Sequence, residues 1–109
     1  MIEVLNALEE TALDNFNGGK GTVYAKIKYT ERNKVLIIRV PSGSSIGMHK
    51  HNGSQETIFV LSGSGKVICD GIEEQVSEGC VHICQNGSSH SIENNGNHDL
   101  ILFGSVVQL

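Results

Sequence analysis

Four side chains of the kinds that bind transition metals recur at short spacing along the chain. His49, His51 and Glu56 fall within eight positions, and His90 follows in a later segment flanked by glycine. Successive side chains of a β-strand point to opposite faces, so His49 and His51 would project from the same side of a strand. Imidazoles and a carboxylate suit Fe, Mn, Co, Ni, Cu or Zn. The spacing therefore predicts a site for one divalent transition metal, and the ligand types leave the metal open.

A turn between the second histidine and the glutamate would bring the carboxylate to the same ion. Asn52-Gly53 is a common turn pair, so Glu56 is expected to approach from a neighbouring strand. An ion held by two or three imidazoles and one carboxylate keeps open coordination positions. It could act as a Lewis acid, lower the pKa of bound water or chelate a substrate.

Length and composition indicate one globular domain. The chain has 109 residues, of which 39% are hydrophobic and 18% charged, a net charge of -4 and three cysteines. The dispersed Lys and Arg form no basic stripe for nucleic acid. No run reaches the roughly 18 apolar residues of a membrane span, and the acidic N-terminus does not resemble a signal peptide. We therefore expect a cytoplasmic protein with reduced thiols and without a nucleic-acid or membrane partner.

Apolar patterning predicts an all-β fold. Residues 22–30 alternate apolar and polar, which is typical of a strand with one wet face. Within the strand expected over 34–40, residues 35–38 are apolar on both parities, so one face should meet the core and the other a further layer or a second subunit. Asp70-Gly71 predicts a type I′ hairpin turn. Other strands are expected over 57–61, 66–69, 72–76, 80–84 and 100–107, which together indicate a sandwich or small barrel.

The N-terminal residues follow a different pattern from the strands. Apolar side chains recur at roughly helical spacing between Ile2 and Phe16, and Gly18, Gly19 and Gly21 follow them. This spacing is typical of a short amphipathic helix or arm. We expect an N-terminal arm or short helix over 1–21 and a single β-barrel domain over 22–109.

The glycines, histidines and glutamate resemble the two signature motifs of the cupin superfamily. The first motif has the order Gly, His, His, Glu, Gly and is matched in spacing by Gly43, His49, His51, Glu56 and Gly63. The second has the order Gly, Pro, Gly, His, Asn and is matched by Gly79, Gly87, His90 and Asn94, with Gln85 in place of the proline. That departure loosens a turn before His90 and removes no ligand.

The resemblance implies a double-stranded β-helix, a conical jelly-roll barrel. It implies that the ion lies in the barrel interior, bound by His49, His51, Glu56 and His90. It also implies a homodimer formed through strand exchange or sheet packing. Members of this superfamily include dioxygenases, isomerases, lyases and decarboxylases as well as proteins that only bind ligands, so fold and ligands do not settle the function.

The role of Cys80, His82 and Cys84 is left open by the sequence. Their side chains lie on the same face of one predicted strand, so they could be taken for the ligands of a second metal ion. At the rise of a strand they spread over about 13 Å, too far for one tetrahedral zinc. We expect one face of this strand to line the barrel and the other to lie in a sheet or dimer contact, where cysteine acts as a small hydrophobe.

Residues that would contact a substrate are harder to predict. Arg39 could bind a substrate carboxylate in bidentate fashion, although a surface or interface salt bridge is the favoured explanation. Tyr29, Met48, Phe59 and Phe103 are candidates to line the cavity, with a plain core role as the alternative. The scarcity of aromatic residues favours a modest pocket for a small polar or aliphatic ligand.

Two functions are compatible with these features. The first is a metal-dependent enzyme of dioxygenase, lyase or isomerase type that acts on a small organic substrate. The second is a non-catalytic module that binds or senses a small molecule such as a sugar or a carboxylate. Proton transfer needs a positioned acid or base, so a cavity without such a group beyond the metal ligands would favour the binding module.

Overall fold

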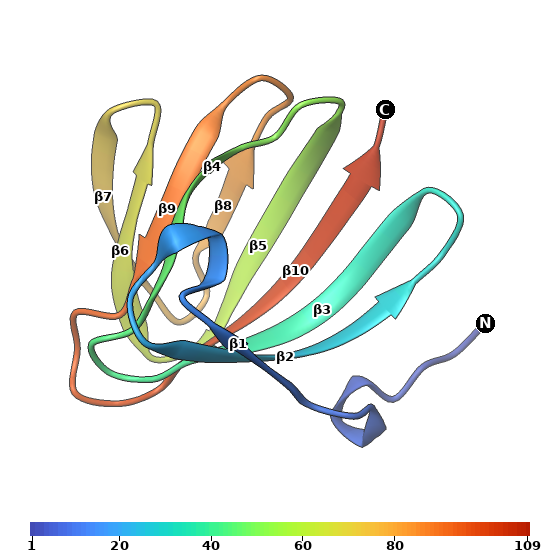
Figure 1. Ribbon diagram of the computed structural model, residues 1–109, viewed down its shortest axis with the longest axis horizontal. Coiled ribbons are helices and arrows are strands. Elements are labelled where there is room, and N and C mark those ends of the chain that lie inside the picture. Colours follow the sequence, from blue (N-terminus) through green and yellow to red (C-terminus); the bar gives the residue numbers. More distant parts are fainter.

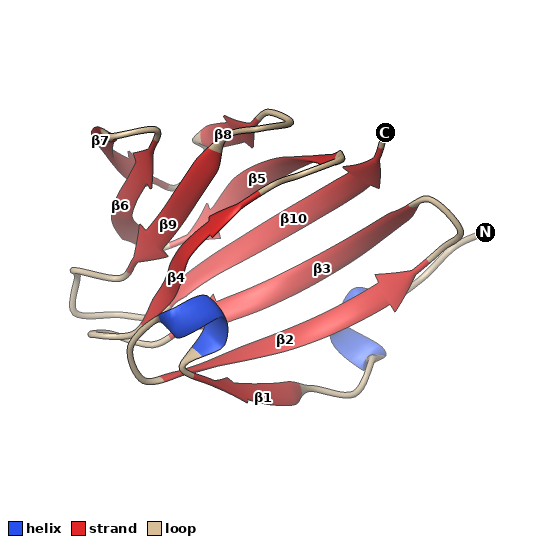
Figure 2. Ribbon diagram, turned by 45° about the horizontal axis from the view of Figure 1, so that its top comes forward, coloured by secondary structure: helices blue, strands red, loops and turns tan.

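The protein consists of ten β-strands in two antiparallel sheets that face each other (Figures 1 and 2). The computed structural model covers residues 1–109. The larger sheet has the order β1-β2-β3-β10-β5-β8 and the smaller one β4-β9-β6-β7. The strands are β1 Thr11–Asp14, β2 Thr22–Tyr29, β3 Asn33–Val40, β4 Ser45–Lys50, β5 Ser54–Ser62, β6 Ser64–Cys69, β7 Ile72–Ser77, β8 Val81–Cys84, β9 Ser89–Glu93 and β10 Leu100–Gln108. This arrangement confirms the all-β jelly-roll prediction.

The core lies between the two sheets and is built by strands whose inward side chains alternate with outward ones. On β3 the inward residues Leu36, Ile38 and Val40 are buried, and on β10 the inward residues Leu100 and Leu102 are buried. Twelve buried apolar side chains form one cluster. The period of two predicted from the sequence therefore sets which face of each strand meets the interior.

The predicted hairpin between β6 and β7 is confirmed. The two strands pair antiparallel from Cys69 with Ile72 back to Ser64 with Ser77. Asp70 and Gly71 both have positive φ, 48° and 79°, which a type I′ turn requires.

The N-terminal residues do not form the helix that their spacing suggested. They form two 3-10 turns, η1 Leu5–Ala7 and η2 Phe16–Gly18, with β1 between them. Asn15 and Asn17 adopt left-handed backbone conformations, with φ of 49° and 53°, which a right-handed helix excludes. Of the two alternatives predicted for this segment, the structure has the arm and not the helix, and the arm extends the larger sheet through pairing of β1 with β2.

The first part of this arm crosses the outer face of β2 and β3. Glu3 pairs with Lys28 at 3.1 Å, and Lys26 donates a hydrogen bond to the carbonyl of Asn6 at 2.8 Å. The second layer expected over β3 is thus provided in part by the chain itself. No helix in the protein is both long and apolar enough to pass through a membrane.

The later part of the arm packs closely against β4. A Cβ atom on Gly47 would lie 2.1 Å from the carbonyl oxygen of Asn17, and one on Gly19 would lie 2.2 Å from that of Ser45. Only glycine permits two backbones to approach so closely. These two residues therefore hold η2 beside the strand that bears His49.

Candidate metal centre

The structure brings the four predicted donors together between the two sheets. His49 lies on β4 directly opposite His90 on β9, and His51 follows β4 by one residue. Glu56 projects from β5 of the larger sheet. The donor atoms of all four lie within 4.8 Å of one another. The turn at Asn52-Gly53 thus carries the chain across to the opposite sheet, a correction to the expected neighbouring strand.

The donor atoms converge at nearly equal spacing. Nε2 of His90 lies 3.1 Å from Nε2 of His49, from Nε2 of His51 and from Oε1 of Glu56. The distance from His51 Nε2 to Glu56 Oε1 is also 3.1 Å. Donors at right angles around an ion about 2.1 Å away would be about 3.0 Å apart. The spacing therefore fits a transition metal.

The other nitrogen of each ring is held by a partner outside this cluster. His49 donates its Nδ1–H to the carbonyl of Gly47 at 2.8 Å, and Nδ1 of His51 lies 3.0 Å from Oγ of Ser54. Nδ1 of His90 lies 2.9 Å from Nε2 of His82. Such partners fix the ring orientation and the tautomer of metal-binding histidines.

This hydrogen-bonding pattern leaves the lone pairs of the histidine Nε2 atoms facing one another and the Glu56 carboxylate. A neutral imidazole protonated on Nδ1 presents a lone pair at Nε2, and the ionised Glu56 presents only acceptors. Three such nitrogens and a carboxylate oxygen repel each other unless a cation lies among them, either a proton or a metal. The residues present therefore fit a divalent ion, and its binding would release any shared proton.

Burial shapes the protonation of these groups. Desolvation lowers the pKa of both His49 and His51 below the ordinary value for histidine. Burial alone would raise the pKa of the Glu56 carboxyl, but the hydrogen bond to His90 and the nearby histidines together hold it below its ordinary value. At neutral pH His49 and His51 are therefore neutral and Glu56 is ionised, as metal binding requires.

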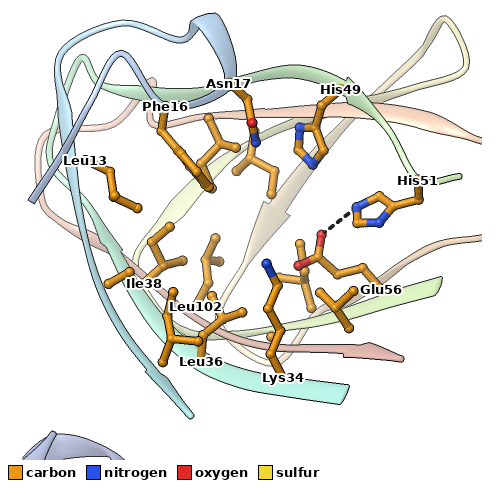
Figure 3. A pocket seen from close by; sticks show the side chains of 17 residues that line it. Leu13, Phe16, Asn17, Lys34, Leu36, Ile38, His49, His51, Glu56 and Leu102 are labelled. Carbon is orange, nitrogen blue, oxygen red and sulfur yellow. Dashed lines mark hydrogen bonds and ion pairs between the residues drawn. The ribbon is translucent and has the colours of Figure 1, made fainter. Parts of the chain in front are cut away.

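A cavity of about 290 Å³ is lined by three of the four donors (Figure 3). Its lining includes His49, His51, Glu56 and Lys34 together with eleven hydrophobic residues. Lys34 points into the cavity towards Glu56 (Figure 3) and is the one ionisable lining residue besides the donors. With a metal bound by the donors, the cavity would offer an anionic ligand two positive centres, the metal and the Lys34 ammonium group.

Sequence reasoning did not identify Lys34, although the sequence holds a signal for it. Lys34 has the same parity on β3 as Leu36, Ile38 and Val40, which are buried in the core. A lysine in register with inward residues should point inward as well. Leu13 and Phe16, which also line the cavity, come from the arm and could not be placed without its path.

The residues expected to contact a substrate lie elsewhere. Arg39 is on the outer face, where it pairs with Glu10 at 3.1 Å and stacks over the ring of Tyr24 at 4.1 Å. Met48, Phe59 and Phe103 do not line the cavity. Phe59 and Phe103 have the outward parity of their strands, and Met48 is exposed because the register of β4 shifts between Ile46 and His49. The expectation that these three residues line the cavity is corrected. Tyr29 lies in an outer hollow that shares Lys34 and His51 with the cavity.

A second cluster lies beside the first and differs from the one considered in the sequence. Cys69 of β6, in place of Cys80, joins His82 and Cys84, with potential ligand atoms within 4.8 Å of one another. Burial raises the pKa of Cys84 to about 12, so its thiol stays protonated. A His90 that binds metal through Nε2 donates its Nδ1–H to His82 Nε2. The other nitrogen of neutral His82 then carries a proton, which makes His82 a support for His90.

Replacement of His82 tests this support. We expect His82→Leu to weaken metal binding by about tenfold to a hundredfold, because the Nδ1–H of His90 would lose its acceptor. His82→Gln should lose less, since its amide oxygen can accept that hydrogen bond. Competition with a chelating dye measures both affinities. Wild-type affinity in the Leu variant would contradict the assignment.

Comparison with known proteins agrees with this fold and site. Residues 36–106 match the family described as the Cupin domain. The chain is 36% identical over 103 residues to an oxalate-binding protein of Thermotoga maritima, covering 89% of this chain and 85% of that protein. The chain therefore belongs to the cupin domain family.

Comparison with solved structures shows which known folds this chain resembles. A crystal structure of a predicted oxalate decarboxylase from Thermotoga maritima matches with a TM-score of 0.95 and 30% identity, covering 100% of both chains. The cupin domain of Schizosaccharomyces pombe Cnp3 matches with a TM-score of 0.80 and 14% identity, covering 97% of this chain and 72% of that one. The second likeness concerns the fold alone.

Proposed function

We propose that the protein binds one divalent transition metal through His49, His51, Glu56 and His90 and uses it to bind a small carboxylate. The observation that carries the proposal is the convergence of these four donors beside a cavity that also contains Lys34. The similarity to an oxalate-binding protein supports a carboxylate as the ligand.

The chemistry of the cavity follows from its charges. The metal, when bound, would supply a Lewis acid that attracts carboxylate oxygens. Lys34 adds a cation on the same side of the cavity, and the lining around it is largely apolar. A charged hydrogen bond is stronger in such surroundings than in water. A ligand with a carboxylate can therefore engage both centres.

We propose a binding module as the leading function and an enzyme as the second candidate. Decarboxylation of a dicarboxylate replaces one carboxylate by a proton, so it needs a proton donor beside the substrate. Lys34 is the one ionisable lining residue besides the donors. The similarity to a predicted oxalate decarboxylase favours the enzyme. Release of CO2 and formate from oxalate by the metal-loaded protein would establish it.

Replacement of Lys34 tests the carboxylate assignment. We expect Lys34→Met to weaken oxalate binding to the metal-loaded protein by about tenfold to a hundredfold, the value of one charged hydrogen bond. Lys34→Arg keeps the charge and should retain more of the affinity. Titration calorimetry measures both variants. Wild-type affinity for oxalate in Lys34→Met, with the metal still bound, would exclude Lys34 as a contact.

We also propose that the protein forms a homodimer through the outer face of the larger sheet. One row of apolar side chains crosses this face, with neighbours paired in register on adjacent strands. The row consists of Ile37 on β3, Phe103 on β10, Phe59 on β5 and Val81 on β8. Val81 is 54% exposed, and Ile83 beside it on β8 is 52% exposed. A row of large apolar side chains on one face is typical of an interface. A second copy would cover the face that the N-terminal arm leaves open.

A charge in this row should separate the dimer. We expect Phe59→Asp to yield a monomer, because a carboxylate buried in an apolar interface lacks a partner. Met48→Asp is a matched control, since Met48 is an exposed apolar residue of the other sheet. Sedimentation equilibrium measures the mass of both. A dimer that persists in Phe59→Asp would place the interface elsewhere.

On composition alone we propose a cytoplasmic location without nucleic-acid or membrane partners.

A further inference from the structure

We propose that the natural ligand is a carboxylate with an extended aliphatic body, larger than oxalate. This inference rests on the proposed function and concerns the ligand class of the same site. The carboxylate would lie at the metal and Lys34, and the aliphatic body would extend towards Leu13 and Phe16.

The cavity has a polar end and an apolar end. His49, His51, Glu56 and Lys34 lie together, and Leu13 and Phe16 lie across the cavity from them (Figure 3). Eleven of its seventeen lining residues are hydrophobic. Ligand sites of this composition bind molecules with an apolar body and a few polar groups. The lining therefore matches an amphipathic acid.

Oxalate would use only the polar end. It consists of two carboxylates joined directly, so it has no apolar atom to place against Leu36, Ile38 or Leu102. A volume of about 290 Å³ equals that of roughly ten water molecules in the liquid. Oxalate alone would leave the apolar end filled with poorly bonded water. A ligand that displaces this water gains affinity.

The apolar end also disfavours a sugar. Apart from the metal donors, Asn17 is the one uncharged residue with a polar side chain in the lining. No buried side-chain nitrogen or oxygen in the protein lacks a hydrogen-bond partner, so no buried polar side chain is left free to hydrogen-bond a sugar hydroxyl. Hydroxyl groups placed there would lose their hydrogen bonds to water without replacement.

The arm gives this end of the cavity its shape. Leu13 lies on β1 and Phe16 on η2, and both pack against the core cluster. The close contacts at Gly19 and Gly47 hold η2 in place. Without the arm the apolar end would open to solvent. The arm is therefore part of the ligand site.

A series of 2-oxo acids with unbranched tails tests the inference, because the head group stays constant. We would titrate glyoxylate, 2-oxobutanoate, 2-oxopentanoate, 2-oxohexanoate and oxalate into the full chain loaded with Mn²⁺. Each buried methylene should lower the Kd about fourfold until the cavity is full, so the longer acids should bind more tightly than glyoxylate. Equal affinities along the series, or oxalate as the tightest ligand, would overturn the inference and leave the proposed function intact.

Variants of the arm separate the body from the head group. Leu13→Ala with Phe16→Ala should remove most of the gain with chain length, because the two side chains form the apolar end of the cavity. Ile2→Ala is the matched control, since Ile2 is 93% exposed on the same arm, and it should bind every acid as the wild type does. A chain-length gain that survives in the double variant would overturn the role of the arm. Failure of all acids, oxalate included, to bind the metal-loaded protein would overturn the proposed function as well.

Discussion

Replacement of His49 and His51 by alanine is expected to reduce bound metal from about one ion per chain to almost none. The double variant leaves one imidazole and one carboxylate, and ligand number largely decides the affinity of such a site. Neither side chain belongs to the apolar core cluster, so the sheets should still form. Elemental analysis by plasma mass spectrometry measures the metal, and circular dichroism monitors the fold.

His98→Ala is the matched control for this experiment. His98 lies in the turn before β10 and is exposed, and it is not among the converging donors. It should keep the wild-type metal content. Undiminished metal in the folded double variant would show that the ion binds elsewhere.

Gly47→Ala is expected to destabilise the protein by about 3 kcal/mol or more, at the upper end for an overpacked site. The new methyl group would meet the backbone oxygen of Asn17 at 2.1 Å, and a backbone atom cannot move aside as a flexible side chain can. The arm would separate from β4, and the carbonyl of Gly47 that orients His49 would shift. Urea unfolding of the metal-free protein measures the loss, and chelator competition measures the weakened metal site.

Gly53→Ala separates this steric effect from backbone strain. Gly53 has a φ of 82° and nothing within 4 Å of an added Cβ, so alanine there should cost only about 1 kcal/mol. If the two alanine variants were equally stable, the close approach of the arm to β4 would not explain why glycine is needed at position 47.

Much of the fold was predictable because the barrel depends on alternation. The period of two on β2 and the Asp70-Gly71 turn are local signals, and the structure confirms both. The N-terminal arm was not predictable in the same way. Its apolar spacing suits a helix, but Asn15 and Asn17 bend the chain and β2 offers a free edge. Pairing with a distant strand thus overrides local propensity.

The candidate site was predictable in its donors and not in its surroundings. Spacing placed His49, His51 and Glu56 in one group, and the resemblance to the cupin motifs added His90. The opposite sheet as the source of Glu56 depends on how the chain crosses the barrel. Cys69 meets His82 because β6 and β8 lie close in space, which no spacing within one strand can reveal.

The most direct test of metal-dependent carboxylate binding is a calorimetric titration of oxalate into metal-loaded and metal-free wild-type protein. We predict saturable binding of one oxalate per chain when the metal is bound and no detectable heat of binding after the metal is removed. The reason is that the metal cation is the principal group in the cavity that binds the oxalate anion. Equal oxalate binding in the absence of metal would contradict this account.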